Sequence, residues 1–120
     1  MDFSRHKRAK VYDKYDGRCA YCGELLYIYD FHVDHIHPKS LGGNDGIENL
    51  NPSCKTCNIQ KRSRTISEFR YYLQQGADVL CSKNAIFRSL VKFGTVTTIK
   101  EITFHFEKQP LRSNSLGAKL

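Results

Sequence analysis

Hydrophobic and polar positions along the first half of the chain change from a helical to an extended spacing and back. Within residues 4–17, apolar side chains recur at helical spacing among basic residues and a glycine follows, which predicts a short basic helix. Residues 25–37 are rich in β-branched and aromatic side chains and predict extended structure, with Asp30 as a candidate turn within it. Pro38 ends the strand because proline cannot donate a ladder hydrogen bond. Clustered glycine, asparagine and aspartate predict a loop over residues 39–53, and a helix is expected to begin within residues 57–64.

The second half of the chain predicts two helices and then a strand. A capping box at residues 65–68 begins a helix with one apolar face, which we expect to end at Gly76. Ser82 is a candidate cap for the next helix, and Gly94 is its candidate stop. Residues 100–108 alternate apolar and polar side chains, which is typical of a half-buried strand.

These elements indicate the α+β class. The length of 120 residues suits a single domain over residues 1–120. We expect its core over about residues 10–65, with accessory helices and a strand over about residues 66–108. A chain of this length buries a modest core, so a metal ion or another staple would help to stabilise it.

Basic residues outnumber acidic ones, with 19 Lys and Arg against 12 Asp and Glu, which gives a net charge of +7. An excess of this size favours a polyanionic partner, most simply nucleic acid, although an ordinary solvated basic surface would give the same count. No apolar run in the sequence is long enough to span a membrane, and the N-terminal residues form no apolar signal core. We therefore expect a cytoplasmic protein without membrane association.

Four of the five cysteines form two pairs with two-residue spacing, Cys19 with Cys22 and Cys54 with Cys57, while Cys81 stands apart. This spacing lets a tight turn direct both thiolates of a pair to one ion, so the two pairs predict a tetrahedral zinc site with four cysteine ligands. Two disulfides are the alternative, but nothing in the sequence indicates secretion. A zinc ion shared by both pairs would fix the predicted strand against the segment after Cys57.

Asp34 and His35, in the predicted strand, and Asn58, directly after the last paired cysteine, form a candidate hydrolytic set. A carboxylate and an amide oxygen are ligands that a hard divalent cation prefers, and they leave positions for water and phosphate oxygens. A neutral imidazole can take a proton from an attacking water. Neighbours on a regular strand point to opposite faces, which argues against one shared site unless the strand is irregular before Pro38.

Four blocks of the chain stand in the order and spacing of a known family: CAYCG, VDHIHPKSLGG, Asn49-Leu50 and CKTCNIQK. Together they resemble the HNH nuclease family, over about half of the chain. The resemblance implies a ββα-metal core with a structural four-cysteine zinc site and flanking helices. It implies that His35 is the general base, that Asp34 and Asn58 bind the catalytic cation, and that Asn49 braces the loop and orients the base. Asn58 stands where the family often has histidine, so the triplet is HNN, and its oxygen favours Mg²⁺ or Mn²⁺.

The implied activity is that of a DNA endonuclease which hydrolyses phosphodiester bonds and leaves 3′-hydroxyl and 5′-phosphate ends. Its cofactors would be a structural Zn²⁺ and a catalytic Mg²⁺ or Mn²⁺. The alternative is a catalytically inactive, zinc-stapled nucleic-acid-binding module, which would not need the hydrolytic set. DNA is the expected partner, in the cytoplasm of a bacterial or phage-infected cell. A homodimer, a larger nuclease partner and a packaging partner all stay open.

Basic side chains near the predicted site are expected to contact DNA phosphates. They are Lys39, Lys55, Lys61 and Arg62, to which the N-terminal helix adds Lys7, Arg8, Lys10 and Lys14. We expect His37 to support the site. The tyrosines of the first cysteine pair and the predicted strand are expected in the core or on a strand face and not as platforms for base stacking; these are Tyr21, Tyr27 and Tyr29.

Overall fold

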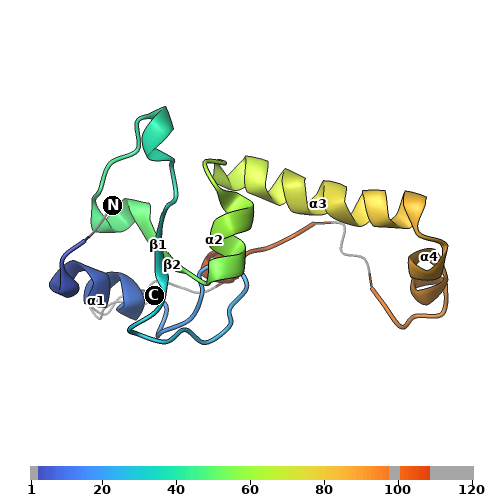
Figure 1. Cartoon of the computed structure of the whole chain (residues 1–120), viewed down its shortest axis with the longest axis horizontal. Coiled ribbons are helices and arrows are strands. Elements are labelled where there is room, and N and C mark those ends of the chain that lie inside the picture. Colours follow the sequence, from blue (N-terminus) through green and yellow to red (C-terminus); the bar gives the residue numbers. More distant parts are fainter. Residues whose placement is uncertain (1–2, 98–100, 109–120) are drawn as a thin grey trace. The chain divides into compact units, whose positions relative to one another are not determined.

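The computed structural model of the chain describes residues 3–97 and 101–108 (Figure 1). These residues belong to two compact units, one within residues 1–65 and 103–120 and the other within residues 66–102. Each helix in the described part of the chain is too short or too polar to cross a membrane.

Helix α1, Arg5–Asp13, begins the first unit and forms where the sequence predicts a basic helix. The Ser4 side chain caps it by accepting a hydrogen bond from the Lys7 N–H at 3.1 Å. A tight turn follows the helix, and its Gly17 has a left-handed φ of 77°. A Cβ at this position would lie 2.7 Å from the Tyr12 hydroxyl oxygen, so the turn requires glycine.

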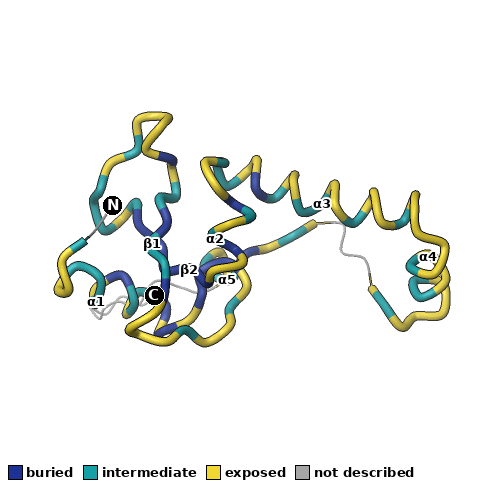
Figure 2. The backbone as a smooth tube through the Cα atoms, viewed as in Figure 1, coloured by how far each residue is buried: buried dark blue, intermediate teal, exposed yellow. Residues whose placement is uncertain are grey.

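Two short strands form an antiparallel sheet in the first unit. Strand β1 is His32–His35 and strand β2 is Leu50–Ser53. The connection between them carries two short 3-10 helices, η1 at Lys39–Leu41 and η2 at Ile47–Asn49. All four residues of β2 are buried, and Figure 2 shows this strand in dark blue beside β1. Val11, Phe31 and Leu50 form the hydrophobic cluster that joins α1 to the sheet.

The strands differ from the sequence predictions at two places. The predicted strand over residues 25–37 is wrong for its first part, which folds back through an isolated bridge between Arg18 and Leu25, whereas the turn expected at Asp30 is confirmed. As a result Tyr27 and Tyr29, expected in the core or on a strand face, lie outside both strands and are 66% and 81% exposed. The predicted loop over residues 39–53 is wrong at its end, where residues 50–53 form β2. The residues Asn-Pro-Ser favour a turn by composition, but here they form a strand because tertiary packing buries them.

Helix α2, Lys55–Lys61, follows β2 directly and contacts β1. Cys54 caps the helix, since its sulfur accepts a hydrogen bond from the Cys57 N–H at 3.4 Å. The helix ends at Arg62, which takes a positive φ of 50°. Two antiparallel strands followed by a helix confirm the predicted α+β class and its ββα core.

Residues 103–108 also belong to the first unit. Phe104 is buried with its ring 5.3 Å from that of Tyr21, and the Phe106 N–H donates to the Ala20 carbonyl oxygen at 2.7 Å. The strand predicted over residues 100–108 is therefore wrong: the segment holds helix α5, His105–Lys108, and Lys100 lies outside the described residues. The aromatic residues that suggested a strand serve instead to anchor this short segment on the first cysteine turn.

The second unit contains helix α3, Ile66–Lys83, packed on helix α4, Ala85–Lys92. The expected end of α3 at Gly76 is wrong, because the helix continues through this glycine for almost two further turns. The cap of α4 is Asn84 and not Ser82, since the Asn84 Oδ1 accepts from the Phe87 N–H at 2.9 Å. The predicted stop is confirmed, as Gly94 follows α4 with a φ of 76°.

Candidate functional site

The four paired cysteines lie together at one end of the ββα core. Their sulfur atoms are all within 4.8 Å of one another, and the Sγ atoms of Cys22 and Cys54 are 3.9 Å apart. All five cysteines of the chain are free thiols, so the disulfide alternative is wrong. A tetrahedral zinc–thiolate centre with bonds of about 2.3 Å places its sulfurs roughly 3.8 Å apart. The four thiols therefore form a site that fits such a metal ion.

Local structure directs each cysteine pair toward the other. In the first pair, the Cys19 N–H donates to the Glu24 carbonyl at 2.8 Å and the Gly23 N–H to the Cys19 carbonyl at 3.0 Å. This places Gly23 in the left-handed region, at a φ of 83°, and closes the turn. The second pair occupies the start of α2, where Cys54 is the cap. The close approach of the thiols changes their acidity. A hydrogen bond from Cys57 lowers the pKa of the Cys19 thiol to about 4.

Asp34 points into the first unit and is only 5% exposed. Its carboxylate accepts a hydrogen bond from the Tyr21 hydroxyl and forms an ion pair with Lys61, whose Nζ is 3.1 Å from Oδ2. Burial nevertheless raises the pKa of Asp34, against the opposing effect of Lys61. Burial and the neighbouring Asp34 charge also raise the pKa of Tyr21 well above its usual range. Asp34 is therefore a buried carboxylate held by two partners that the sequence analysis did not assign to it.

Lys61 is fully buried, and its ammonium group also donates to the His35 carbonyl oxygen at 2.7 Å. The Lys61 ammonium group is enclosed by protein and cannot contact a phosphate of DNA. The structure thus corrects the expected phosphate contact of Lys61, because the ammonium ties α2 to two successive residues of β1.

His35 makes a different set of contacts from its neighbour Asp34. Its Nε2 lies 2.7 Å from the Asp45 Oδ1, in the long loop, and the Lys39 Nζ is 3.3 Å from the other oxygen of this carboxylate. The hydrogen bond with His35 lowers the pKa of Asp45. In the sequence, Asp45 is one of several turn-forming residues, and no local signal distinguishes it, since only the folded loop brings it back to the strand.

Asn49 braces the same loop, as the resemblance implies. Its Oδ1 accepts from the His37 N–H at 2.9 Å, and its Nδ2 donates to the carbonyl oxygens of His37 and Asn44 at 3.1 and 2.8 Å. Gly43 packs against this junction so closely that a Cβ would clash with the His37 carbonyl oxygen. His37 is exposed, and its Nε2 lies 3.1 Å from the Leu41 carbonyl oxygen, a contact within the loop.

A cavity of about 380 Å³ brings the candidate hydrolytic set together. Asp34, His35 and Asn58 line it, with the basic side chains of Lys39 and Arg62 at its walls. Asp34 and His35 are neighbours on β1 and contact different residues, but both line this cavity. The Asp34 carboxylate and the Asn58 amide oxygen are hard donors, and the carboxylate keeps acceptor capacity beyond its two partners. This donor set fits a divalent cation such as Mg²⁺.

The other predicted phosphate contacts have different surroundings. Lys55 is exposed on α2 and does not line the cavity. On α1, Arg8 donates to the Phe31 carbonyl oxygen at 2.8 Å, and the Lys14 ammonium donates to carbonyl oxygens of the loop and of β2. Burial lowers the pKa of Lys14 to about 8. The expectation that Arg8 and Lys14 are free for DNA is therefore corrected, because both side chains stabilise the first unit.

Comparison with known proteins identifies the region that contains this site. The sequence profile of the family described as HNH endonuclease matches residues 19–64. The "SPbeta prophage-derived putative HNH endonuclease YoqL" of Bacillus subtilis (strain 168) is 35% identical over 71 residues, which cover 50% of this chain. The crystal structure of the Type II-C Cas9 enzyme from Actinomyces naeslundii superposes on 59% of this chain with a TM-score of 0.51 and 26% identity.

The matched regions are small parts of these relatives. They cover 30% of the length of the prophage-derived protein and 8% of the Cas9 chain. The matched family region contains both cysteine pairs, both strands and α2, and thus all four residues of the cavity and loop that the resemblance assigned.

Proposed function

We propose that the protein is a metal-dependent endonuclease that hydrolyses phosphodiester bonds in DNA, because residues 19–64 match the HNH endonuclease family. The observation that supports this proposal most strongly is the cavity that Asp34, His35 and Asn58 share with two basic side chains. A base, two oxygen ligands and cationic walls are the parts that metal-assisted hydrolysis of a phosphodiester requires.

His35 is the general base of the proposed reaction. Because its Nε2 lies at the Asp45 carboxylate, that nitrogen carries the proton and Nδ1 is left to accept one from the attacking water. Asp45 then stabilises the imidazolium that forms, in the manner of the carboxylate that orients a catalytic histidine elsewhere. The Lys61 hydrogen bond to the His35 carbonyl oxygen fixes the backbone from which the ring projects.

Asp34 and Asn58 would hold the catalytic cation, for which we propose Mg²⁺ or Mn²⁺. When bound, the cation stabilises the negative charge that develops on the leaving sugar oxygen. Lys39 and Arg62 lie at the cavity wall, where they bind the phosphates that flank the scissile bond. Loss of the 3′ oxygen as the leaving group gives 3′-hydroxyl and 5′-phosphate ends.

The four cysteines would hold a structural Zn²⁺, which links the first cysteine turn to the start of α2. Asn58 follows Cys57 directly, so this link fixes the amide relative to β1. Free thiols suit a reducing compartment, and we place the activity in the cytoplasm of a bacterial or phage-infected cell.

One observation favours a second candidate, a nucleic-acid-binding module without catalysis. The Asp34 carboxylate is engaged by Tyr21 and Lys61, which is the arrangement of a structural ion pair as much as of a metal ligand. The zinc site, the charge and the fold would be the same in both cases, so the metal dependence of cleavage distinguishes them.

The test is cleavage of supercoiled plasmid by the zinc-loaded protein with Mg²⁺, with Mn²⁺ or without added metal, beside Asn58→Ala. We expect metal-dependent nicked or linear plasmid from the wild type, which DNA ligase can reseal where nicked. Asn58→Ala should need more metal or cleave at least about ten-fold more slowly, and should still retard the plasmid in a gel. A wild type that binds DNA and never cleaves it would support the binding module.

A further inference from the structure

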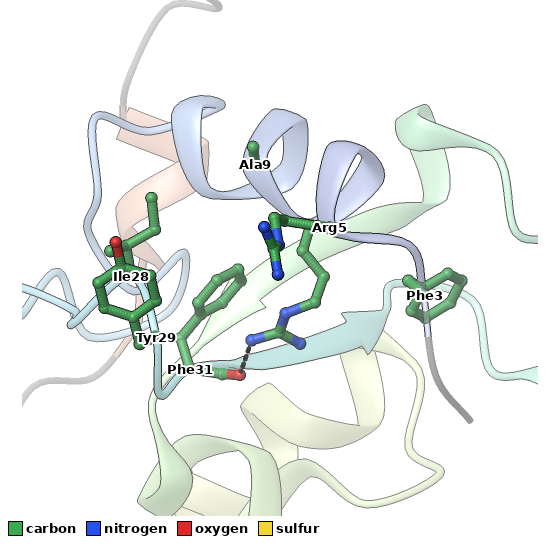
Figure 3. A pocket seen from close by; sticks show the side chains of 7 residues that line it. Phe3, Arg5, Ala9, Ile28, Tyr29 and Phe31 are labelled. Atoms are coloured by element: carbon green, nitrogen blue, oxygen red, sulfur yellow. Dashed lines mark hydrogen bonds between the residues drawn. The ribbon is translucent and has the colours of Figure 1, made fainter.

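A second cavity, of about 620 Å³, lies in the first unit between α1 and residues 28–31 (Figure 3). Phe3, Arg5 and Arg8 line it from the N-terminal side, and Tyr29 and Phe31 from the facing segment. Among the residues that the structure describes, its lining includes two guanidinium groups and three aromatic rings and no acidic side chain. The cavity therefore combines positive charge with apolar, planar surfaces.

The two arginines of this cavity have different surroundings. Arg8 is held in place, because it donates to the Phe31 carbonyl oxygen at 2.8 Å and its guanidinium lies 4.3 Å from the centre of the Phe31 ring. Arg5 is exposed and makes no side-chain hydrogen bond or ion pair with any residue that the structure describes. Figure 3 shows Arg5 on α1, facing the segment that carries Tyr29 and Phe31. Arg5 is thus the cation available to an anionic ligand.

Tyr29 supplies an exposed aromatic surface at the same cavity. The side chain is 81% exposed, although its ring contacts the Tyr27 ring at 5.5 Å. A ring left this open beside a cation is accessible for stacking by a planar ligand. A nucleobase is a suitable ligand, since every base offers a flat face for stacking and arginine binds its phosphate.

The second cavity adjoins the proposed catalytic site through Phe3. Phe3 lines the cavity, and its ring centre lies 6.0 Å from that of His35. A strand whose scissile phosphate meets His35 therefore passes close to Phe3 and the second cavity.

We propose that this cavity binds one unpaired nucleotide of the substrate strand, next to the phosphodiester that is cut. Arg5 pairs with the phosphate of that nucleotide and Tyr29 stacks on its base. The nucleotide is unpaired because the faces of paired bases are covered within the duplex and cannot reach an aromatic ring. This inference rests on the proposed nuclease function for the identity of the strand, and it predicts a preference for DNA with a gap or a flap.

The test measures binding of the zinc-loaded protein, without added Mg²⁺, to two fluorescent DNAs by anisotropy. One is a fully paired duplex, and the other is the same duplex with a short single-stranded gap. The variants are Tyr29→Ala and Arg5→Gln. Their matched controls are Tyr71→Ala, a tyrosine 66% exposed in the second unit, and Lys83→Gln, an exposed cation on α3 in the same unit.

We expect the wild type to bind the gapped DNA more tightly than the paired duplex. Tyr29→Ala and Arg5→Gln should lose affinity for the gapped DNA by about five-fold or more and should retain their affinity for the duplex, while both controls match the wild type. Equal effects on the two DNAs, or no effect on either, would overturn the proposal. Circular dichroism and zinc content establish that each variant is folded.

Plasmid cleavage by the same proteins separates this inference from the proposed function. If the wild type cleaves plasmid and the variants show no selective loss on gapped DNA, the cavity proposal fails and the nuclease stands. If the wild type never cleaves and the selective loss is present, the nucleotide site stands and the nuclease fails.

Discussion

At the scale of single residues, the contact between His35 and Asp45 carries the proposed chemistry. In the proposed mechanism, the carboxylate holds the proton on Nε2 and stabilises the charge that the ring gains. Asp45→Ala should therefore lower kcat by about ten- to a hundred-fold and leave KM nearly unchanged. Asp45→Asn, which keeps an acceptor oxygen, should recover part of that loss. Steady-state cleavage of a labelled duplex measures both constants.

The control for this prediction is Asp30→Ala, which removes an exposed carboxylate in the same unit. If Asp45→Ala and Asp45→Asn cleave as fast as Asp30→Ala, Asp45 does not position the base. A change confined to KM would assign Asp45 to DNA binding instead.

The buried pair of Asp34 and Lys61 leads to a prediction for stability. Lys61→Met removes the cation and leaves a carboxylate that is 5% exposed with the Tyr21 hydroxyl as its remaining partner. Loss of one member of a buried ion pair costs about 3–5 kcal/mol of the free energy of unfolding. Urea unfolding should show this loss for Lys61→Met and almost none for Lys55→Met, an exposed lysine on the same helix.

A second substitution separates the charge effect from lost packing. Lys61→Met combined with Asp34→Asn should recover part of the lost stability, because no unpaired buried charge remains. A single variant as stable as Lys55→Met would mean that the ion pair contributes nothing to the fold.

The motif residues and their partners differ in how far the sequence predicts them. Asp34, His35 and Asn58 could be chosen because their spacing around the cysteine pairs is a local signal. Tyr21 and Asp45 could not, since they meet Asp34 and His35 only through contacts between segments 10 or more residues apart. Lys61 was singled out, but its charge suggested solvent and phosphate, and its burial arises from packing between α2 and β1.

At the scale of elements, burial outweighs local propensity. β2 forms from Leu-Asn-Pro-Ser, a sequence that predicts a turn, because β1 supplies its hydrogen-bond partner and all four of its residues are buried. α1 was predictable from its apolar spacing, and the helix expected within residues 57–64 overlaps α2, although its start at Lys55 was not predicted. Residues 25–31 show the reverse effect, since strand-forming side chains remain outside the sheet.

Gly76 within α3 gives an element-scale prediction. A Cβ at this position would contact nothing within 4 Å, and the backbone is helical. Gly76→Ala should therefore stabilise α3 by about 0.5–1 kcal/mol, because alanine loses less entropy on forming a helix. Gly42→Ala is the matched comparison, since it also has free space but a φ of 96°, and it should destabilise the first unit.

Urea denaturation followed by circular dichroism at 222 nm measures both glycine variants. A loss of stability in Gly76→Ala would mean that α3 is not a continuous helix through residue 76. An unchanged Gly42→Ala would mean that its left-handed conformation is not required.

At the scale of the whole molecule, the described residues form two units, and we expect only the first to depend on metal. The first has a small hydrophobic cluster and the four-cysteine site, whereas the second consists of two helices without a share in that site. Cys54→Ser should therefore lose zinc and unfold the first unit, and α3 and α4 should keep part of the helical signal. Cys81→Ser, which removes the unpaired cysteine, should retain zinc and structure.

Zinc content by mass spectrometry and circular dichroism on the same samples test this dependence. A Cys54→Ser protein that is free of zinc, shows the native spectrum and cleaves plasmid would show that the metal is dispensable.

The predicted core over about residues 10–65 corresponds to the larger part of the first unit. The sequence could not show that residues 103–108 return to this unit, because that return depends on the packing of Phe104 against Tyr21. The cysteine pairs, in contrast, indicated from their spacing alone which distant segments the fold would bring together.

The measurement that tests the central claim most directly is the rate of plasmid cleavage by His35→Ala beside His32→Ala. Both histidines lie on β1 and both are half-buried, but only His35 lines the cavity and contacts Asp45. With Mg²⁺, we expect His32→Ala to cleave like the wild type and His35→Ala to be slower by at least about a hundred-fold while it still binds DNA. Equal cleavage by the two variants would contradict the assignment of His35 as the general base.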